Sequence, residues 1–306
     1  MGGLHSPPSM EPPLTHPEPS RAESGITDGY SLEVTARSMA ALTTSASRIM
    51  PGASIFVPDL PGDDDDARLA ALSAIRGLGF EPVPHLSARH VPSLAALASF
   101  VRRAVTEAGV ERCFIIAGDL SSATGPFSDS TSLIETGVFE RAGIKVIGVG
   151  GHPQAHPVMS EAERWDALAG KCRRIEQRGM APLIVTQFAF DADIVLAWLQ
   201  QLRAHGIDHP VRVGVPGPAG VAVLVRYAAL CGVSASASMW SKYGLSIGKL
   251  LGTAGPGLFV DRLASGLTAA HGQVSLHVFP FGGIAQSVAW IEQYRDRHAA
   301  SAMGSG

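Results

Sequence analysis

The chain has 306 residues and a formal net charge of −3, and 46% of its residues are hydrophobic and 17% charged. This composition supplies a large apolar core and excludes a globally disordered chain. The near-balanced charge gives no reason to expect nucleic acid or an anionic membrane as a partner. No apolar run reaches the roughly 18 residues that a membrane-spanning helix needs.

The two ends of the chain and the spacing of its cysteines indicate where the folded domain lies and in which compartment it works. Residues 1–28 are rich in proline and lack the apolar core of a signal peptide, so we predict a disordered tail there. Residues 299–306 are small and are expected to fray. Cys113, Cys172 and Cys231 lie far apart without a Cys/His metal-ligand spacing, which favours a reducing cytoplasm.

Between these ends, residues 29–298 alternate between short apolar segments and longer helix-like segments, as one domain. The predicted strands are 30–36, 54–60, 81–88, 112–120, 144–150, 182–190, 211–215 and 274–281. The predicted helices are 37–50, 67–78, 93–108, 132–142, 160–178, 191–205, one ending at 230, and 284–298, with helical pieces over 234–271. Alternation is typical of a parallel sheet, and eight such units predict an α/β fold, a single-domain closed (β/α)8 TIM barrel. No GxGxxG sequence follows the first strand, which argues against a doubly wound dinucleotide-binding sheet.

Four consecutive aspartates, residues 63–66, precede the second predicted helix. We interpret them as a helix N-terminus, where the helix dipole favours acidic side chains. A divalent-metal site is the alternative interpretation, and it is disfavoured because adjacent aspartate side chains diverge from the backbone.

Polar residues stand at the predicted strand ends, which in a parallel barrel form one ligand-binding rim. They are Glu33, His85, Asp119, His152, His156 and Gln187. Glu33 interrupts an apolar strand. If it faces inward, burial would raise its pKa and make it a candidate general acid; if it faces outward, it is structural. Asp119 follows Gly118 directly and is either a ligand-binding residue or a turn residue.

The remaining rim residues also allow two interpretations. The Gln187 amide suits the edge of a heteroaromatic ring, or closes a buried structural network. His85 binds a ligand or is a satisfied core histidine. Phe188 stacks on a ring or belongs to the core. His152 and His156 have no third metal ligand spaced with them, so an organic ligand is favoured over a metal.

Six short motifs follow one another along the chain: Ser31–Thr35 (SLEVT), Pro84–Ser87 (PHLS), Ala117–Leu120 (AGDL), His152–Pro157 (HPQAHP), Thr186–Asp191 (TQFAFD) and Val215–Gly217 (VPG). Together they resemble the motifs of the methylenetetrahydrofolate reductase family. The family reduces 5,10-methylenetetrahydrofolate to 5-methyltetrahydrofolate in one-carbon metabolism. Hydride passes from NADH or NADPH to FAD and then to the folate. The resemblance implies that pathway role, in methionine biosynthesis or in demethylation of a growth substrate.

The resemblance also implies roles for individual residues. Glu33 would be the general acid that opens the methylene bridge, and Asp119 would lie beside pterin and flavin. Substrate contacts would come from Asp119, Gln187 and Phe188. The cofactor would be held by His85, Gly118, Asp119, His152, His156, Arg174 and Gln187.

Departures from the family motifs leave more than one function open. Ala117 stands where the family has the arginine of Arg-Gly-Asp, and His152 stands where it has a tyrosine. Both changes affect the flavin side, so direct hydride transfer without flavin is one alternative to the flavin relay. A folate barrel that transfers a methyl group without redox chemistry is a second, and a non-catalytic barrel that binds folate or flavin is a third. Folate and nicotinamide are the expected small-molecule partners, and a homo-oligomer stays open.

Overall fold

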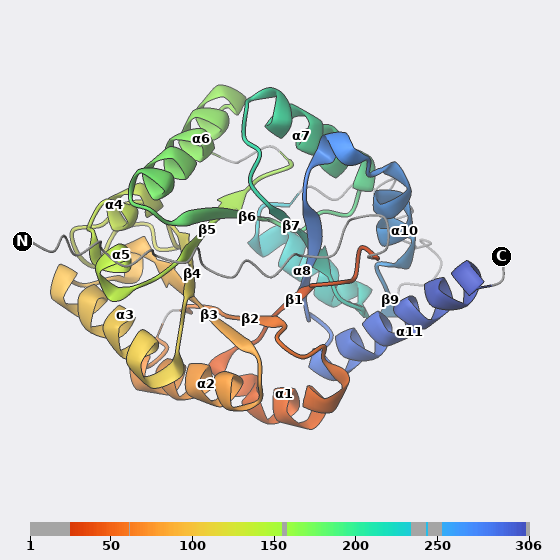
Figure 1. Cartoon of the computed structure of the whole chain (residues 1–306), viewed down its shortest axis with the longest axis horizontal. Coiled ribbons are helices and arrows are strands. Elements are labelled where there is room, and N and C mark those ends of the chain that lie inside the picture. The colour runs from red at the N-terminus through yellow and green to blue at the C-terminus, as the bar shows by residue number, and fades with distance from the viewer. Residues whose placement is uncertain (1–24, 61, 155–157, 234–242, 244–252, 304–306) are drawn as a thin grey trace, which may run out of the picture.

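Eight parallel strands close into one barrel in the computed structural model, which describes residues 25–60, 62–154, 158–233, 243 and 253–303 (Figure 1). The barrel strands are β1 (Ser31–Glu33), β2 (Ser54–Val57), β3 (Glu81–Ser87), β4 (Arg112–Ile116), β5 (Val146–Gly151), β6 (Ala181–Thr186), β7 (Val211–Pro216) and β10 (Val274–Phe279). Consecutive strands are neighbours, and β10 pairs with both β7 and β1 to close the ring. The predicted (β/α)8 barrel and its eight strands are confirmed.

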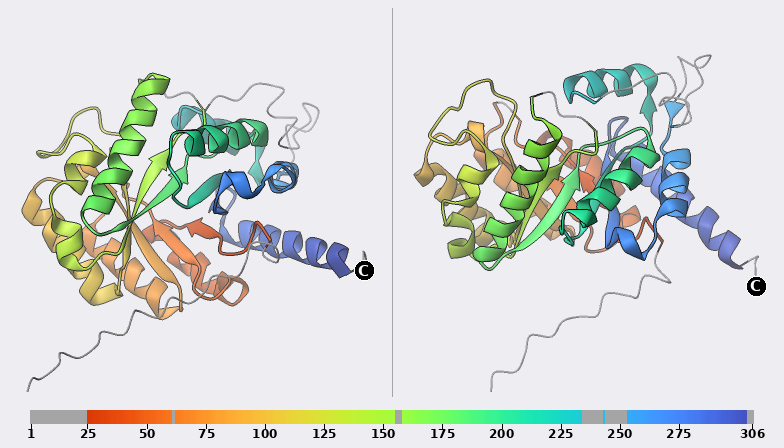
Figure 2. Two further views of the ribbon diagram at one scale, coloured as in Figure 1. Left: turned by 45° about the horizontal axis from the view of Figure 1, so that its top comes forward. Right: turned by 90° about the horizontal axis from the view of Figure 1, so that it is seen from above.

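Helices surround the barrel and cover the outer faces of the strands (Figures 1 and 2). They are α1 (Met39–Ser45), α2 (Asp65–Gly77), α3 (Leu94–Ala108), α4 (Ser130–Ile134), α5 (Val138–Ala142), α6 (Glu161–Gln177), α7 (Ala192–Ala204), α8 (Val221–Leu230), α10 (Gly257–Gly266) and α11 (Ile284–Met303). Single 3-10 turns occupy Ala36–Ser38, Ala46–Arg48, Ala88–His90 and Ala269–His271. Because the strands are covered outside and packed inside, they are apolar on both faces.

The four consecutive aspartates, residues 63–66, lie at the N-terminus of α2. The Asp64 side chain caps α2 by accepting hydrogen bonds from the backbone N–H groups of Asp66 and Ala67. Asp65 and Asp66 lie in the first turn, where they complement the helix dipole. In the part of the chain that the structure describes, no group of three or more His, Cys, Asp or Glu side chains is placed to hold a metal ion.

Element boundaries differ from the predictions where backbone geometry intervenes. The helix expected over 132–142 is two short helices, because Gly137 between them adopts a left-handed φ of 73°. The helix expected over 37–50 shrinks to α1 between two 3-10 turns. The closing helix continues to Met303, past the expected end at 298. The tail predicted for 1–28 lies outside the described residues up to position 24.

The connection after β7 contains an addition that was not predicted. β8 (Ala219–Gly220) and β9 (Thr253–Ala254) form a small antiparallel pair. Between them α8 lies toward the same end of the molecule as the loop after β4 (Figure 2). Tyr227 of α8 stacks on Phe281, which follows β10, with ring centroids 4.0 Å apart. This stack anchors α8 to the carboxyl end of the last strand.

The barrel interior is a separate apolar cluster from the larger core between strands and helices. It contains Phe56, Val83, Phe114, Leu183 and Val185. Among the described helices, none is long and apolar enough to cross a membrane.

Candidate active site

Glu33, the last residue of β1, points into the barrel. Its Oε2 lies 3.6 Å from Nε2 of His85 on β3 and 3.8 Å from Nε2 of His277 on β10. The Glu33 side chain is 23% exposed, whereas the side chains of His85 and His277 are 8% and 1% exposed. The inward interpretation of Glu33 is therefore correct, and its carboxyl is the accessible member of the group. We call Glu33, His85 and His277 the acid cluster.

Aromatic rings and one hydroxyl hold the two histidines in place. Phe114 lies edge-on to His85 with ring centroids 4.7 Å apart, and Phe56 lies 4.6 Å from His277. Ser31 Oγ lies 2.8 Å from Nδ1 of His277, and the same oxygen lies 3.4 Å from the Leu276 carbonyl oxygen. When the hydroxyl donates to that carbonyl, Nδ1–H of His277 donates to Ser31. The Nε2 lone pair of His277 then faces Glu33.

Burial sets the charge of all three groups. It raises the pKa of the Glu33 carboxyl, and the nearby His85 offsets that rise in part. Burial also lowers the pKa of His85 to about 4 and that of His277 to about 3. Both imidazoles are therefore neutral at pH 7, and the site favours a proton on Glu33.

Asp119 lies outside this cluster, on the rim beyond β4. Its side chain is 71% exposed, and its Oδ1 lies 2.9 Å from Nε2 of His90. Nδ1 of His90 in turn faces Oδ1 of Asp59 at 3.6 Å. Gly118 makes this approach feasible, because it has a φ of 91° and a Cβ there would lie 3.1 Å from Cβ of Ser87.

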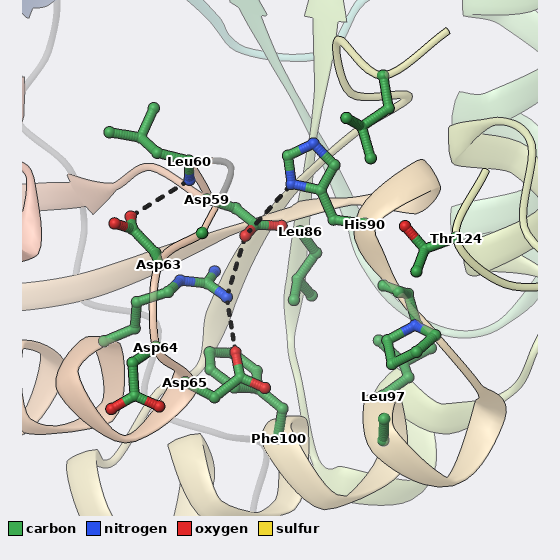
Figure 3. Close-up of a pocket in the computed structure, with 16 residues that line it drawn as sticks. Asp59, Leu60, Asp63, Asp64, Asp65, Leu86, His90, Leu97, Phe100 and Thr124 are labelled. Carbon is green, nitrogen blue, oxygen red and sulfur yellow. Dashed lines mark hydrogen bonds and ion pairs between the residues drawn. The ribbon is translucent and has the colours of Figure 1, made fainter. Parts of the chain in front are cut away.

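A cavity of about 480 Å³ borders the rim beside His90 (Figure 3). Asp59, Arg68 and His90 supply its polar side, and residues such as Leu97 and Phe100 supply an apolar side. Arg68 is buried, forms ion pairs with Asp59 and Asp65, and donates to the backbone carbonyl of His85. Arg68 thus connects the cavity wall to the backbone of the acid cluster.

Gln187 stands at the exit of β6. Its backbone N–H donates to the Gly151 carbonyl at 2.9 Å, and its own Oε1 accepts from the backbone N–H of Phe188 at 3.0 Å. Gly214 of β7 lies directly beneath this exit, since a Cβ there would lie 2.5 Å from the Thr186 carbonyl oxygen. The absence of a side chain at Gly214 therefore allows the Gln187 backbone to turn over the barrel.

Phe188 belongs to a cluster of aromatic side chains. It is 2% exposed, and its ring lies 5.7 Å from those of Phe190 and Phe279 and 5.2 Å from that of Phe281. This position matches the core interpretation of Phe188. It leaves little of the ring open to a substrate.

The predicted cofactor residues come from β3, from the exits of β4, β5 and β6, and from α6. Arg174 is near the end of α6, and its Nε donates to Oε1 of Glu135 at 2.6 Å. His85 is inside the barrel, and the backbone carbonyl of His152 accepts from Arg164. His156 lies outside the described residues. Among the described members of this set, Arg174 thus pairs with a carboxylate, and His85 lies in the acid cluster.

Three functional candidates were missed by sequence reasoning. They are His277, His90 and Asp59. His277 carried a detectable signal, because it is a polar residue within an apolar strand, as Glu33 is. His90 and Asp59 follow their strands by a few residues, and nothing in the sequence pairs them with Asp119.

The arrangement offers an accessible carboxylic acid at the barrel mouth, with an exposed carboxylate and an amide on the surrounding rim. Such a set can donate a proton to a bound heterocycle and hold that ring by hydrogen bonds.

Comparison with known proteins gives two kinds of similarity. A family model described as methylenetetrahydrofolate reductase matches residues 45–246. Methylenetetrahydrofolate reductase 2 of Saccharomyces cerevisiae (strain ATCC 204508 / S288c) is 26% identical over 145 residues, which cover 45% of this chain and 24% of the yeast protein. The matched part thus spans about a quarter of that relative's length.

Solved structures give similarity of a weaker kind. Dihydropteroate synthase from Thermus thermophilus, in complex with 6HMPPP, has a TM-score of 0.44 at 15% identity, covering 86% of this chain and 92% of that one. The 3-dehydroquinate dehydratase from Aquifex aeolicus has a TM-score of 0.41 at 10% identity, covering 67% and 87%. At these scores the likenesses carry no argument about function.

Proposed function

The chain belongs to the methylenetetrahydrofolate reductase family, and we propose that it reduces 5,10-methylenetetrahydrofolate to 5-methyltetrahydrofolate with hydride from NADH or NADPH. The observation that carries the proposal is the acid cluster. A partly exposed carboxyl stands at the mouth of the barrel beside His85, with its pKa raised by burial, and this reduction needs a proton donor of that kind.

The chemistry follows from where that proton goes. Glu33 donates it to the ring nitrogen that leaves the methylene carbon, so the carbon–nitrogen bond breaks and an iminium forms at the other nitrogen. Hydride then adds to the methylene carbon and gives the methyl group. The Glu33 carboxylate regains a proton from solvent through its exposed edge.

Asp119 and Gln187 are proposed to hold the substrate ring. Asp119 presents an exposed carboxylate that can accept hydrogen bonds from the amino and N–H groups of a pterin. Gln187 presents an amide at the exit of β6, two strands from Asp119, and this amide is suited to pterin or to the nicotinamide carboxamide. Both lie at the carboxyl ends of barrel strands, where barrel enzymes bind ligands.

FAD is the hydride carrier that the family resemblance implied, and it would supply a two-electron relay if bound. The described residues do not fit its phosphates as expected, because Arg174 pairs with Glu135 and Ala117 carries no charge. We therefore derive no step through flavin. Direct transfer from the nicotinamide ring to the folate is the second candidate route.

A substitution of the acid tests the proposal. Glu33→Gln keeps the size of the side chain and removes the proton donor, so kcat should fall by about 100-fold or more, while the folded structure remains. The measurement is the rate of NAD(P)H oxidation with 5,10-methylenetetrahydrofolate under anaerobic conditions.

A matched control is Glu111→Gln, which alters a carboxylate that pairs with Lys145 before β4, at the opposite end of that strand. That variant should retain full activity. Near-normal turnover in Glu33→Gln would remove Glu33 from the role of acid. Methyl transfer without any NAD(P)H consumption by the unmodified protein would favour the non-redox alternative.

A further inference from the structure

Asp119 needs a fixed orientation to act on a ligand, and its own strand does not supply it. The preceding residues, Gly118 and Ala117, carry no side-chain donor, and the carboxylate is 71% exposed. A free carboxylate in that setting samples several rotamers, at an entropic cost when it binds. The contact that fixes Asp119 comes from a different strand exit, through His90.

His90 is itself held rigidly against the loop that carries Asp119. The backbone N–H of Arg89 donates to the Ala117 carbonyl at 2.9 Å, and the N–H of Thr124 donates to the Arg89 carbonyl at 2.8 Å. The Arg89 guanidinium donates, at 2.9 and 3.0 Å, to the backbone carbonyls of Leu120 and Ser128. These four hydrogen bonds, all made by the adjacent residue Arg89, fix the segment that carries His90.

The other ring nitrogen of His90 faces a second carboxylate. Asp59 Oδ1 lies 3.6 Å from Nδ1, and Asp59 is fixed by the Ser87 backbone N–H at 3.0 Å and by Arg68 at 3.4 Å (Figure 3). The charged groups around the imidazole are therefore Asp59, Asp119 and, behind Asp59, Arg68. His90 is 12% exposed, so these interactions are only partly screened by solvent.

We propose that His90 is the positioning residue of Asp119, supplying from the exit of β3 the donor that the exit of β4 lacks at Ala117. His90 Nε2–H donates to Asp119 Oδ1 and leaves Oδ2 free for a ligand. Asp59 Oδ1 faces the opposite side of the ring at 3.6 Å, beyond hydrogen-bond distance. The proposal rests on the proposed function in so far as Asp119 contacts the substrate.

The proposal makes a specific kinetic claim. His90 does not touch the reacting atoms, so its loss should weaken binding of the folate more than it slows the chemical step. His90→Ala removes a hydrogen bond to a charged group, so KM for 5,10-methylenetetrahydrofolate should rise about ten-fold or more with kcat changed by less than about three-fold.

Two further variants separate positioning from a general structural effect. His90→Gln retains a side-chain donor and should recover part of the lost affinity. Ala117→Arg in the His90→Ala background places a cation two residues before Asp119 and should recover KM as well. His209→Gln is the control, because His209 faces Glu176 at 3.6 Å, away from Asp119, and should leave KM unchanged. Unaltered KM in His90→Ala would overturn the proposal.

A second measurement does not depend on activity. Nitrogen-15 NMR of the histidine rings at pH 8 should show His90 fixed as the Nε2–H tautomer. Asp119→Ala, a change at an exposed site, should shift His90 toward a tautomer mixture. An unchanged His90 signal would overturn the pairing. If the unmodified protein lacks reductase activity while this shift is seen, the proposed function fails and the pairing stands.

Discussion

A partly buried carboxyl group beside two neutral histidines is the central feature of this protein at the scale of single residues. Burial raises the pKa of the Glu33 carboxyl, and it lowers the pKa of His85 to about 4 and that of His277 to about 3. Both imidazoles are therefore neutral at pH 7, and the raised pKa shifts Glu33 toward its protonated form.

The histidines of the acid cluster should make stability depend on pH. Their folded pKa values, about 4 and about 3, lie below the unfolded value of 6.5. The unfolded chain therefore binds more protons below pH 6.5, and stability falls as pH drops from 6.5 toward 4. Each histidine should lower the free energy of unfolding by roughly 2 kcal/mol when the pH falls from 7 to 5. Glu33 has the opposite effect. Because its pKa is raised in the folded protein, its contribution to stability is lost as the pH rises through that pKa.

Urea unfolding at pH 7 and pH 5 measures this effect. His85→Gln and His277→Gln should each show a smaller loss of stability at pH 5 than the unmodified protein. His209→Gln, at a partly exposed position, serves as the control and should not change the difference. Equal pH dependence in all four proteins would contradict the assignment of neutral, buried imidazoles.

Sequence reasoning found Glu33 and His85 but not His277, for a physical reason. A carboxylate within an apolar strand is visible in the pattern of one segment. The pairing of residues 33 and 277 depends on β10 closing the ring beside β1, which no local pattern encodes. Asp119 was likewise recognisable as a rim residue, whereas His90 and Asp59 become relevant only through contacts between three different strand exits.

At the scale of elements, the exits of β6 and β7 depend on a close backbone approach. Gly214→Ala should be destabilising by roughly 1–3 kcal/mol, because the new Cβ meets backbone atoms of Thr186 and Phe188 that belong to the strand exit. The same displacement should move Gln187 and raise KM for the folate. Urea unfolding and steady-state kinetics measure the two effects.

Gly257→Ala provides the matched glycine control. Gly257 begins α10, and no atom lies within 4 Å of a Cβ built there. Alanine favours helix over glycine, so this variant should be neutral or slightly stabilising. If Gly214→Ala proved as harmless as Gly257→Ala, the account of the β6 exit would be wrong.

Element types were more predictable than element ends. Alternation of apolar and amphipathic segments identified all eight barrel strands, because each is buried on both faces. The break between α4 and α5 at Gly137 and the pair formed by β8 and β9 were missed. They depend on one left-handed residue and on a contact between segments far apart in the sequence.

At the scale of the whole molecule, the closed barrel brings residues from β1, β3 and β10 to one point and places Asp119 and Gln187 on the same rim. The fold followed from the count of alternating units. The cofactor stays a prediction, because Arg174, one of the residues expected to hold it, pairs with Glu135, and His156 lies outside the described residues.

Absorbance of the purified protein distinguishes the two hydride routes. Direct transfer predicts a colourless protein that oxidises NAD(P)H without added flavin. Flavin bands in the visible spectrum, and activity that is lost on removing the flavin and restored by FAD, would instead support the relay and show that other residues hold its phosphates.

The central claim is reduction of the methylene carbon, and product analysis tests it most directly. Anaerobic incubation with NADH or NADPH and 5,10-methylenetetrahydrofolate, with and without FAD, should yield 5-methyltetrahydrofolate by mass spectrometry. One NAD(P)H should be consumed per product, and Glu33→Gln should yield little product. Absence of 5-methyltetrahydrofolate under all of these conditions, from correctly folded protein, would contradict the account.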